Sequence, residues 1–373
     1  MRVVYVCADR GIPLLGDKGA SVHLRSLASA LARRGNQVTL ACRNVEGQNP
    51  APSGVRVERI PDEGDRGGDR LGSLCREVRA EVVLERYSLS SGPARVAADV
   101  LGVPQVLEIN APLVDEAARY RGLTEVERWR GWEGAVFGGA DRLIAVSTGV
   151  KAHIEHLDVA ASRVTVIHNG VDVDRFHDAD GSAVRARHNL GDATVVGFSG
   201  SLKPWHGVDA LLEAFAKLPS ATRLLIAGDG PEGLALRRLA DVLGIADRTV
   251  FSGAVPHDRM PEYLAAMDVG VAPYEAQSDF YFSPLKVVEY LAAGLALVTT
   301  EQGDLGEMVG DAGLLVPPGD TPLLAAALGE LCGDPARRRS LGEAASARSL
   351  LYDWDTVAGR VEQVLTARGV AAC

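Results

Sequence analysis

Short runs of apolar, often β-branched residues alternate with longer segments of helical periodicity along most of the 373-residue chain. Strand, helix and strand in strict alternation require crossover connections, which make the strands parallel and cover both faces of the sheet with helices. The first half predicts strands at Val3–Ala8, Gln37–Cys42, Val55–Ile60, Glu81–Glu85, Gln105–Ile109, Arg142–Val146 and Val164–Ile167. Helices are expected between them at Ala20–Arg34 (ended by Gly35), Ser90–Leu101 and Leu123–Phe137.

The alternation restarts after a polar connector at residues 177–182. The second half predicts strands at Thr194–Phe198, Arg223–Ala227, Val250–Ser252, Val269–Ala272, Ala296–Thr299 and Gly313–Val316. Helices are expected at Val208–Lys217, Pro231–Leu243, Met260–Met267, Leu285–Ala293 and Pro322–Cys332. We therefore expect an α/β protein with two Rossmann-like, doubly wound domains, residues 1–177 and 178–352. Such domains bind ligands at the carboxyl ends of their strands, here in a cleft that both sheets face.

Composition excludes several other classes of protein. The net charge is −10 and the chain has no long Lys/Arg run, which argues against a nucleic-acid partner. Five cysteines without a C-x-x-C pair suggest reduced thiols in a cytoplasmic protein. Met1-Arg2 leads directly into a strand, so no signal peptide is expected, and no apolar run reaches the roughly 20 residues that span a bilayer.

Two motifs belong to the first half. Gly16–His23 follows the first strand and opens the first helix, so backbone N–H groups near Gly19 and Ala20 can face a phosphate or sugar oxygen. Such a loop is as often a simple turn. His168-Asn169-Gly170-Val171-Asp172 predicts a turn, followed by Val173-Asp174. The Asp172-Val173-Asp174 triplet resembles a metal-binding D-x-D, but it has no accompanying His or Glu cluster, and we interpret it as a capping and turn segment.

Two further motifs begin the second half. In the loop Gly200–Gly207, Ser201, Lys203 and His206 lie beside a predicted helix N-terminus, which suits a diphosphate. Lys203 could instead be an ordinary surface lysine, but its place beside a helix terminus favours the functional interpretation. Gly228-Asp229-Gly230-Pro231 then ends the next strand, with Pro231 at a helix start.

The most specific motif covers residues 278–294. Ser283 is a good N-cap, Pro284 a good first helical residue before Leu285, and Gly294 a stop. Free N–H groups at this terminus can bind a phosphate, and Glu289 can accept both hydroxyls of a ribose. Glu289 can also be a simple helix acid, but its neighbours are apolar, and an unpaired buried acid would be costly.

Together these motifs resemble, in order and spacing, family 4 glycosyltransferases of the GT-B fold, and the resemblance covers nearly the whole chain. It implies retaining transfer from a nucleotide sugar, with UDP- or GDP-linked donors expected first. It implies no metal and no cofactor beyond this co-substrate. It also implies that a last helix, near Asp353–Arg368, packs back on the N-terminal domain.

The chain departs from the family pattern at three places. The family has Glu where Tyr281 stands, so the residue that contacts the donor sugar is not determined, and Asp279 is a candidate. The usual Arg and Lys of the diphosphate loop align with Ser201 and His206, which leaves Lys203 as the expected cation. The resemblance then implies that Lys203, His206 and N–H groups near Ser283 hold the leaving diphosphate.

The third departure lies after the strand Gln105–Ile109, where the family has a catalytic His. Here Glu108 and Asn110 are the candidates for the cleft. The acceptor is expected to be a small molecule, a glycan or a lipid-linked molecule, with at most peripheral membrane contact. Residues 112–130 are a candidate region for it, but Glu125 and Glu127 interleave there and favour a solvated helix face instead. Two alternatives stay open: a sugar-nucleotide epimerase of the same fold, and a nucleotide-sugar-binding protein without turnover. A dehydrogenase is disfavoured because neither first strand precedes G-x-G-x-x-G.

Overall fold

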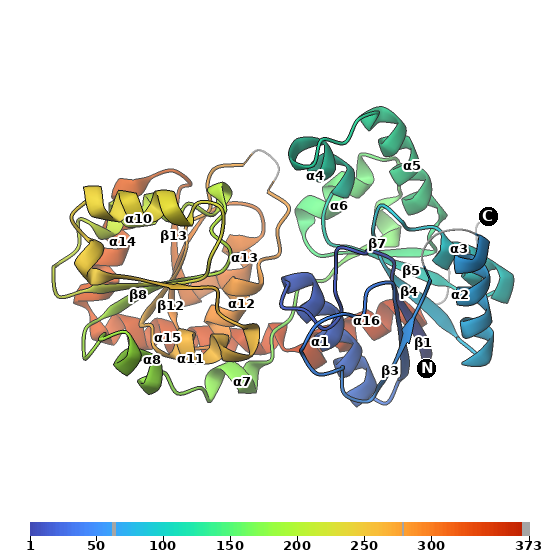
Figure 1. Ribbon diagram of the computed structural model, residues 1–373, viewed down its shortest axis with the longest axis horizontal. Coiled ribbons are helices and arrows are strands. Elements are labelled where there is room, and N and C mark those ends of the chain that lie inside the picture. The colour runs from blue at the N-terminus through green and yellow to red at the C-terminus, as the bar shows by residue number, and fades with distance from the viewer. Residues whose placement is uncertain (62–64, 278–279, 368–373) are drawn as a thin grey trace. The chain divides into compact units, whose positions relative to one another are not determined.

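The computed structural model describes residues 1–61, 65–277 and 280–367. Within this range the chain forms two compact units (Figure 1). Unit 1 contains Met1–Gly170, Tyr281–Ser283 and the chain from Trp354 onward, and unit 2 contains Val171–Phe280 and Pro284–Asp353. The division falls slightly before the expected boundary at 177–178, because α7 (Val173–His177) packs against helices of unit 2.

In the described residues, unit 1 has a seven-stranded sheet with the order β3-β2-β1-β4-β5-β6-β7. All its strand pairs are parallel, so the predicted sheet is confirmed. The strands are β1 (Arg2–Cys7), β2 (Gln37–Cys42), β3 (Val55–Arg59), β4 (Val82–Arg86), β5 (Gln105–Ile109), β6 (Arg142–Ala145) and β7 (Val164–Val166). The helices are α1 (Gly19–Arg33), α2 (Asp65–Glu77), α3 (Pro93–Leu101), α4 (Leu113–Tyr120), α5 (Val126–Gly139), α6 (Thr148–Glu155) and α16 (Trp354–Thr366).

Strand β1 shows why its sequence is a nearly continuous apolar run. Val3 and Tyr5 pack into a core with α1 and α16, whereas Val4 and Val6 pack into a separate core with α2 and α3. Because successive side chains of a strand point to opposite faces, a strand covered on both faces must be apolar throughout. Because β1 and β4 are parallel neighbours, their carboxyl ends lie at the same edge of the sheet, and the strand order reverses between them.

Unit 2 has a six-stranded parallel sheet in its described residues, with the order β10-β9-β8-β11-β12-β13. This is the dinucleotide-binding strand order, and it reverses between β8 and β11. The strands are β8 (Val195–Ser199), β9 (Arg223–Ala227), β10 (Thr249–Gly253), β11 (Val269–Ala272), β12 (Ala296–Thr300) and β13 (Gly313–Val316). The helices are α7, α8 (Ser182–Arg187), α9 (Val208–Phe215), α10 (Gly233–Val242), α11 (Met260–Ala265), α12 (Leu285–Ala292), α13 (Leu305–Val309), α14 (Thr321–Gly333) and α15 (Pro335–Ser349).

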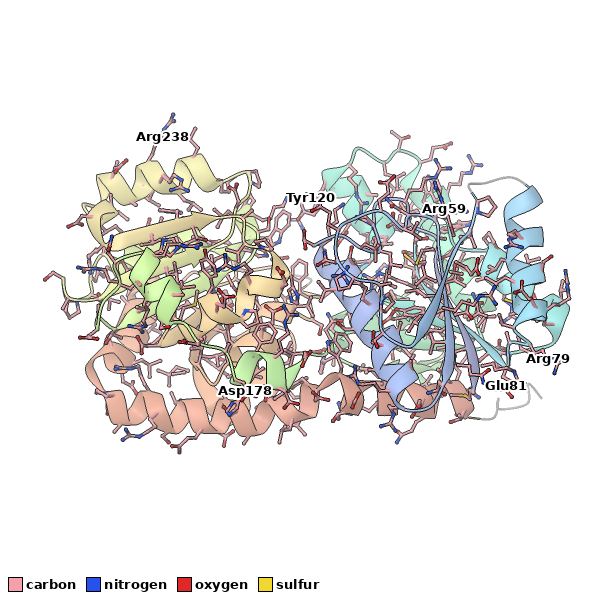
Figure 2. All side chains as sticks on the ribbon, turned by 60° about the horizontal axis from the view of Figure 1, so that its bottom comes forward. Arg59, Arg79, Glu81, Tyr120, Asp178 and Arg238 are labelled. Carbon is pink, nitrogen blue, oxygen red and sulfur yellow. The ribbon has the colours of Figure 1, made fainter. Side chains whose placement is uncertain are left out.

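Helix α10 of unit 2 is amphipathic, as its sequence indicates. On α10, Leu236 and Ala240 are buried in the core, while Arg238 points outward into solvent (Figure 2). Gly294 has φ +64° and follows the end of α12, which confirms it as the predicted stop. No helix in the described ranges has both the length and the apolar character needed to cross a bilayer.

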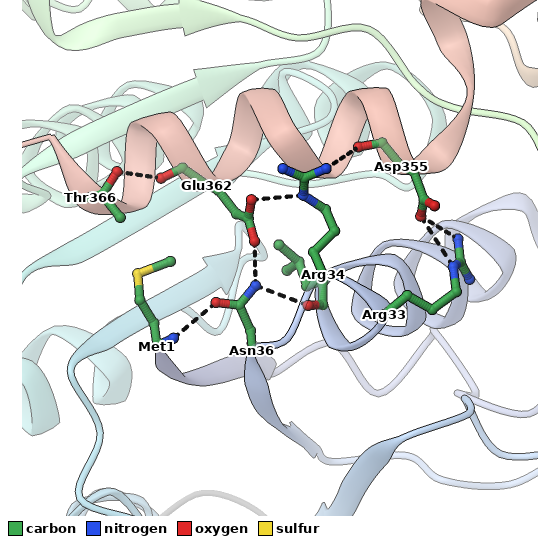
Figure 3. Close-up of polar contacts among 8 residues, drawn as sticks. Met1, Arg33, Arg34, Asn36, Asp355, Glu362 and Thr366 are labelled. Carbon is green, nitrogen blue, oxygen red and sulfur yellow. Dashed lines mark hydrogen bonds and ion pairs between the residues drawn. The ribbon is translucent and has the colours of Figure 1, made fainter.

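The last helix, α16, belongs to unit 1 and packs along α1. The Trp354 ring meets the His23 ring edge-to-face at 5.3 Å between centroids. Polar contacts flank this apolar seam (Figure 3). The Arg34 Nε donates to Glu362 at 2.7 Å, Glu362 also accepts from the amide of Asn36, and Arg33 pairs with Asp355 at 2.7 Å.

Candidate functional site

The carboxyl ends of β8 and β9 approach each other so closely that only glycine fits between their loops. A Cβ on Gly228 would lie 1.9 Å from the Gly200 carbonyl oxygen. The two loops are also bonded, because Leu202 N–H donates to the Asp229 carbonyl at 3.0 Å. Asp229 itself is exposed, and its carboxylate accepts from the N–H of Gly230 at 2.8 Å. The predicted residues Ser201, Gly228 and Asp229 thus lie together at the strand-order reversal.

Lys203 lies in the same loop, directly before the short 3-10 helix η2 (Pro204–His206). Its ammonium is 5.8 Å from the centroid of the Trp205 ring, and the residue is half-buried. A cation held against an aromatic face near a close backbone turn remains available to an incoming anion. The prediction that Lys203 binds the diphosphate is therefore compatible with its position, and it stays a prediction.

His206 was expected to help hold the diphosphate. Its Nδ1 bonds to the Ser201 carbonyl, and because a carbonyl only accepts, Nδ1 carries the proton. Burial, with the nearby charges of Lys286 and Lys203, lowers the pKa of His206 to about 3. The ring is therefore neutral at physiological pH and its Nε2 is an acceptor. A neutral ring brings no positive charge to a departing diphosphate, and the predicted role of His206 there stays a prediction.

Lys286 is the cation that sequence reasoning missed. It lies in the first turn of α12, is only 9% exposed, and its Nζ has no hydrogen-bond partner within the described residues. The Nζ lies 4.0 Å from the ring centroid of Phe198 on β8 and 5.2 Å from that of Tyr274 after β11. A Cβ on Gly200 would be 3.3 Å from this Nζ. The amine therefore sits at the point where the strand order reverses.

Burial also changes the protonation of this amine. It lowers the pKa of Lys286 to about 7, although Glu289 acts in the opposite direction. An amine that is desolvated and has no hydrogen-bond acceptor gains strongly from a bound anion. The signal in the sequence was a single lysine placed between Leu285 and Val287 in an apolar helix, and it was not recognised.

The start of α12 differs from the prediction by one position. The helix runs from Leu285, and Pro284 rather than Ser283 is its N-cap, without a side-chain capping bond. Ser283 belongs to unit 1, where its hydroxyl accepts from Asn169 N–H at 3.0 Å and its carbonyl from the Asn169 amide at 2.6 Å. Because no side chain caps this terminus, its first N–H groups stay available to an anion.

Glu289 lies one turn further along the same helix and is 8% exposed. Its Oε1 is 3.0 Å from Nε2 of His257, which lies before α11. All residues of α12 from Lys286 to Ala292 are buried. Glu289 is therefore a buried, oriented carboxylate near Lys286, and the expectation of a simple surface acid is excluded.

Tyr281 and Asp279 were the alternatives for the sugar contact. Tyr281 belongs to unit 1, where its hydroxyl donates to Glu116 at 2.6 Å and its carbonyl accepts from the Ser147 hydroxyl at 2.6 Å. These bonds attach it to α4 and to the loop after β6. Asp279 lies outside the described residues.

Glu108 is buried inside unit 1 rather than presented at its surface. It is 3% exposed, and its two oxygens bond to the Tyr5 hydroxyl at 2.6 Å and to His23 Nε2 at 2.5 Å. The charge and hydrogen bonds of His23 overcome the effect of burial and lower the pKa of Glu108 to about 2. With both oxygens occupied, Glu108 acts as a fixed acceptor in the core, so we correct its assignment to the cleft.

The remaining predicted residues of unit 1 lie near the carboxyl ends of its strands. Gly19 is the exposed first residue of α1 and Ala20 is half-buried; the N-cap Lys18 makes no side-chain capping bond. Asn110 follows β5, and its side-chain nitrogen is buried without a hydrogen-bond partner in the described part of the chain. Its assignment to substrate binding stays a prediction.

Metal ligands were not expected from the Asp172-Val173-Asp174 triplet. Asp172 is the N-cap of α7, where its side chain accepts from Arg175 N–H at 3.4 Å, which confirms the capping role. Residues 1–61, 65–277 and 280–367 contain no group of three or more His, Cys, Asp or Glu that could hold a metal ion.

Known families match both halves of the sequence. Residues 18–175 match the family described as Glycosyltransferase Family 4, and residues 193–334 match Glycosyl transferases group 1. A D-inositol 3-phosphate glycosyltransferase of Streptomyces scabiei is 31% identical over 95% of this chain and 88% of its own length. The chain belongs to glycosyltransferase family 4. It is therefore a glycosyltransferase with the GT-B fold.

Other relatives agree with this assignment. The D-inositol 3-phosphate glycosyltransferase of Mycobacteroides abscessus is 34% identical over 86% of this chain and 78% of its own length. Among solved structures, HepE of Anabaena in complex with UDP has a TM-score of 0.80 at 20% identity, covering 98% of this chain and all of its own. The lipopolysaccharide glycosyltransferase WaaG has a TM-score of 0.72 at 19% identity, covering 98% and 100%. At these identities the two structures support the fold alone.

Proposed function

We propose that this glycosyltransferase transfers a sugar from a nucleoside diphosphate sugar, with UDP as the first nucleotide to test, to an acceptor hydroxyl with retention of the anomeric configuration. The buried amine of Lys286 is the observation that carries the proposal. It lies at the strand-order reversal of unit 2 beside the Gly200 backbone, where doubly wound sheets bind ligands. A diphosphate would supply the acceptor oxygens that the amine lacks.

Other parts of the nucleotide have matching groups in unit 2. The uncapped N-terminus of α12 offers backbone N–H groups to a phosphate. Glu289, oriented by His257, offers a carboxylate to the two ribose hydroxyls. Solved structures of HepE contain UDP and UDP-glucose, which supports a UDP-linked donor for this protein.

The chemical step follows from where charge develops. The acceptor oxygen attacks the anomeric carbon on the face from which the diphosphate leaves, and the bond between that carbon and the phosphate oxygen breaks. The acceptor proton passes to the departing phosphate, so the charges balance without an outside base. Lys286 and Lys203 stabilise the negative charge on the leaving group, which is commonly the largest contribution to such a reaction.

The acceptor is proposed from the relatives. Several are named D-inositol 3-phosphate glycosyltransferases at 31–34% identity, so D-inositol 3-phosphate is the first acceptor to test. The test incubates the protein with UDP- and GDP-sugars, with and without this acceptor, and follows product by mass spectrometry and its anomeric configuration by NMR. Transfer only when an acceptor is present, with an α-linked product from an α-linked donor, is the expected result.

Two results would contradict the proposal. Conversion of the donor sugar into its epimer without an acceptor would instead show an epimerase. Donor binding without turnover across a wide set of sugar and polyol acceptors would show a nucleotide-sugar-binding protein.

A further inference from the structure

Helix α7 carries an arginine that forms no ion pair with an acid in the described part of the chain. The guanidinium of Arg175 is half-buried, and its Cζ lies 5.9 Å from the ring centroid of Phe176. Its Nη2 donates to the backbone carbonyl of His257 at 2.8 Å. A half-buried charge has lost part of its hydration, and this charge-assisted bond offsets part of that loss. The bond joins α7 to the loop between β10 and α11.

This loop has little packing of its own to fix it. His257 begins η4 (His257–Arg259), a 3-10 helix of three residues, and both chain neighbours of His257 are exposed. The His257 carbonyl accepts from the N–H of Met260 within the turn and from Arg175 on another helix. A single 3-10 turn is a weak element, so the second bond restricts where the His257 backbone lies.

The ring of His257 is fixed from the same helix. Phe176 is 2% exposed, and its ring meets the imidazole at 6.2 Å between centroids with an interplanar angle of 63°. The Asp172 side chain caps α7, and this helix packs against α11 and α12. Because Arg175 and Phe176 are consecutive, one short, capped helix holds both the backbone and the side chain of His257.

The imidazole in turn orients Glu289. Its Nε2 donates to Oε1 of Glu289 at 3.0 Å, because a carboxylate oxygen can only accept. The second oxygen, Oε2, makes no hydrogen bond within the described residues and remains for a ligand. A carboxylate that is already held in place loses less conformational entropy on binding than one that the ligand must order. All the groups in this chain of contacts belong to unit 2.

We propose that Arg175 is a positioning residue for the donor nucleoside. Through the His257 carbonyl it holds the imidazole, the imidazole holds Glu289, and the preference for ribose over 2′-deoxyribose depends on this order. The inference rests on the proposed function, which assigns the ribose hydroxyls to Glu289. It also gives residues 172–177 a role without a metal, because their capped helix supports the carboxylate that binds the nucleoside.

The experiment is a calorimetric titration with UDP and with GDP, each compared with its 2′-deoxy analogue. The wild type should bind the ribose form of its nucleotide about tenfold or more tightly. Arg175→Met keeps the length of the side chain and removes its donors, and it should lower this ratio by about threefold or more. The loss should fall on the ribose form, with the 2′-deoxy affinity unchanged. Arg175→Lys, which retains a charged donor, should keep part of the preference.

Arg238→Met is the matched control, because Arg238 points into solvent from α10 of the same unit (Figure 2). It should leave the ratio at the wild-type value. An arginine that only stabilises the fold gives a different result. Arg175→Met would then lower the melting temperature and leave the ratio unchanged, and this outcome would overturn the proposal.

A second measurement needs no nucleotide. In the ligand-free protein, the bond to Glu289 should protect the Nε2 proton of His257 from exchange with solvent, and comparison with His257→Gln identifies its NMR signal. Arg175→Met should speed this exchange, and Arg238→Met should not. Unchanged exchange in Arg175→Met would show that Arg175 does not hold the pair of His257 and Glu289, which also overturns the proposal.

These results separate the inference from the proposed function. A protein that transfers sugar, and whose ribose preference is the same in wild type and Arg175→Met, contradicts only the role of Arg175. A wild type that binds neither nucleotide contradicts the proposed function. The exchange of the His257 proton then still reports whether Arg175 orients Glu289 through His257.

Discussion

At the scale of single residues, a buried lysine amine without a hydrogen-bond partner weakens the fold, since its charged form has lost its hydration. Lys286 is such a residue. Its amine lies beside the Gly200 backbone, where we propose that the diphosphate binds, and this role explains why a residue that lowers stability occupies the position. Lys286→Met keeps the length of the side chain and removes the charge. UDP affinity should fall by about 1.5–3 kcal/mol, roughly ten- to a hundredfold, in calorimetric titration. Lys217→Met, at an exposed position after α9, is the control and should leave UDP affinity unchanged.

The protonation of Lys286 predicts a pH dependence. Burial lowers its pKa to about 7 in the folded protein, whereas an unfolded chain has the ordinary value of about 10.4. Between these values the unfolded chain binds more protons, so the stability of the ligand-free protein should rise with pH over this interval. A bound diphosphate favours the charged amine, so UDP affinity should instead fall as the pH rises above about 7, with uptake of a proton.

Titrations with UDP in buffers of different ionisation enthalpy would measure this proton uptake. Lys286→Met should abolish it, whereas His206→Asn should retain it, because the pKa of His206 is already lowered to about 3. Proton uptake that disappears in His206→Asn and persists in Lys286→Met would show that the histidine titrates instead.

Glu289 carries the prediction for the nucleoside. A carboxylate held by His257 at 3.0 Å can accept both ribose hydroxyls, and each such bond contributes about 1.5–3 kcal/mol. The wild type should therefore prefer UDP to its 2′-deoxy analogue, Glu289→Gln should prefer it less, and Glu289→Ala should not distinguish them. Circular dichroism checks that the variants are folded. Equal discrimination by wild type and Glu289→Ala would make Glu289 structural.

At the scale of elements, the strands were predictable because parallel strands covered on both faces leave long apolar runs, as in β1. Helices with a weaker apolar pattern were missed. α15 contains a run of three arginines, and α4 follows a proline and has only eight residues. Both are stabilised by packing against other elements, and a local sequence pattern does not report such contacts.

The same limit applies to the candidate site. Glu289 and the end of α12 at Gly294 were predictable from local sequence, because capping and spacing are local properties. The burial of Lys286 and Glu108 was not, because each depends on residues far along the chain, such as Phe198 for Lys286 and Tyr5 for Glu108. Lys203 and His206 were preferred to Lys286 for binding the diphosphate because only their charge and loop position could be seen in the sequence.

Helix α16 gives a stability prediction with an internal control. Trp354 is 4% exposed, touches His23 and lies so close to Gly170 that a Cβ there would be 2.7 Å from the indole. Trp354→Ala should destabilise the protein by about 3–5 kcal/mol in denaturant unfolding. Asp355→Ala, on the next residue, removes an exposed pair with Arg33 and should cost about 0–1 kcal/mol. Similar losses for both variants would mean that α16 is held by its surface charges.

At the scale of the whole molecule, the candidate groups are distributed over two units built from interleaved segments of one chain. Unit 1 includes Tyr281–Ser283 and α16, so the chain enters it three times. Unit 2 contains the groups proposed for the donor. UDP should therefore raise the melting temperature by an amount that grows with the logarithm of its affinity, and this increase should be reduced in Lys286→Met but retained in Lys217→Met.

The metal requirement also concerns the whole molecule, because a divalent ion could offset the charge of the leaving diphosphate in place of side chains. The proposed mechanism assigns that charge to Lys286, Lys203 and the N-terminus of α12. Asp172, in the triplet that most resembles a metal motif, already caps α7. Turnover should therefore continue in excess EDTA at the rate measured without it. A loss of turnover that Mn²⁺ or Mg²⁺ restores would contradict this mechanism, and residual activity of Lys286→Met that rises with added Mg²⁺ would show that a metal can take over the same role.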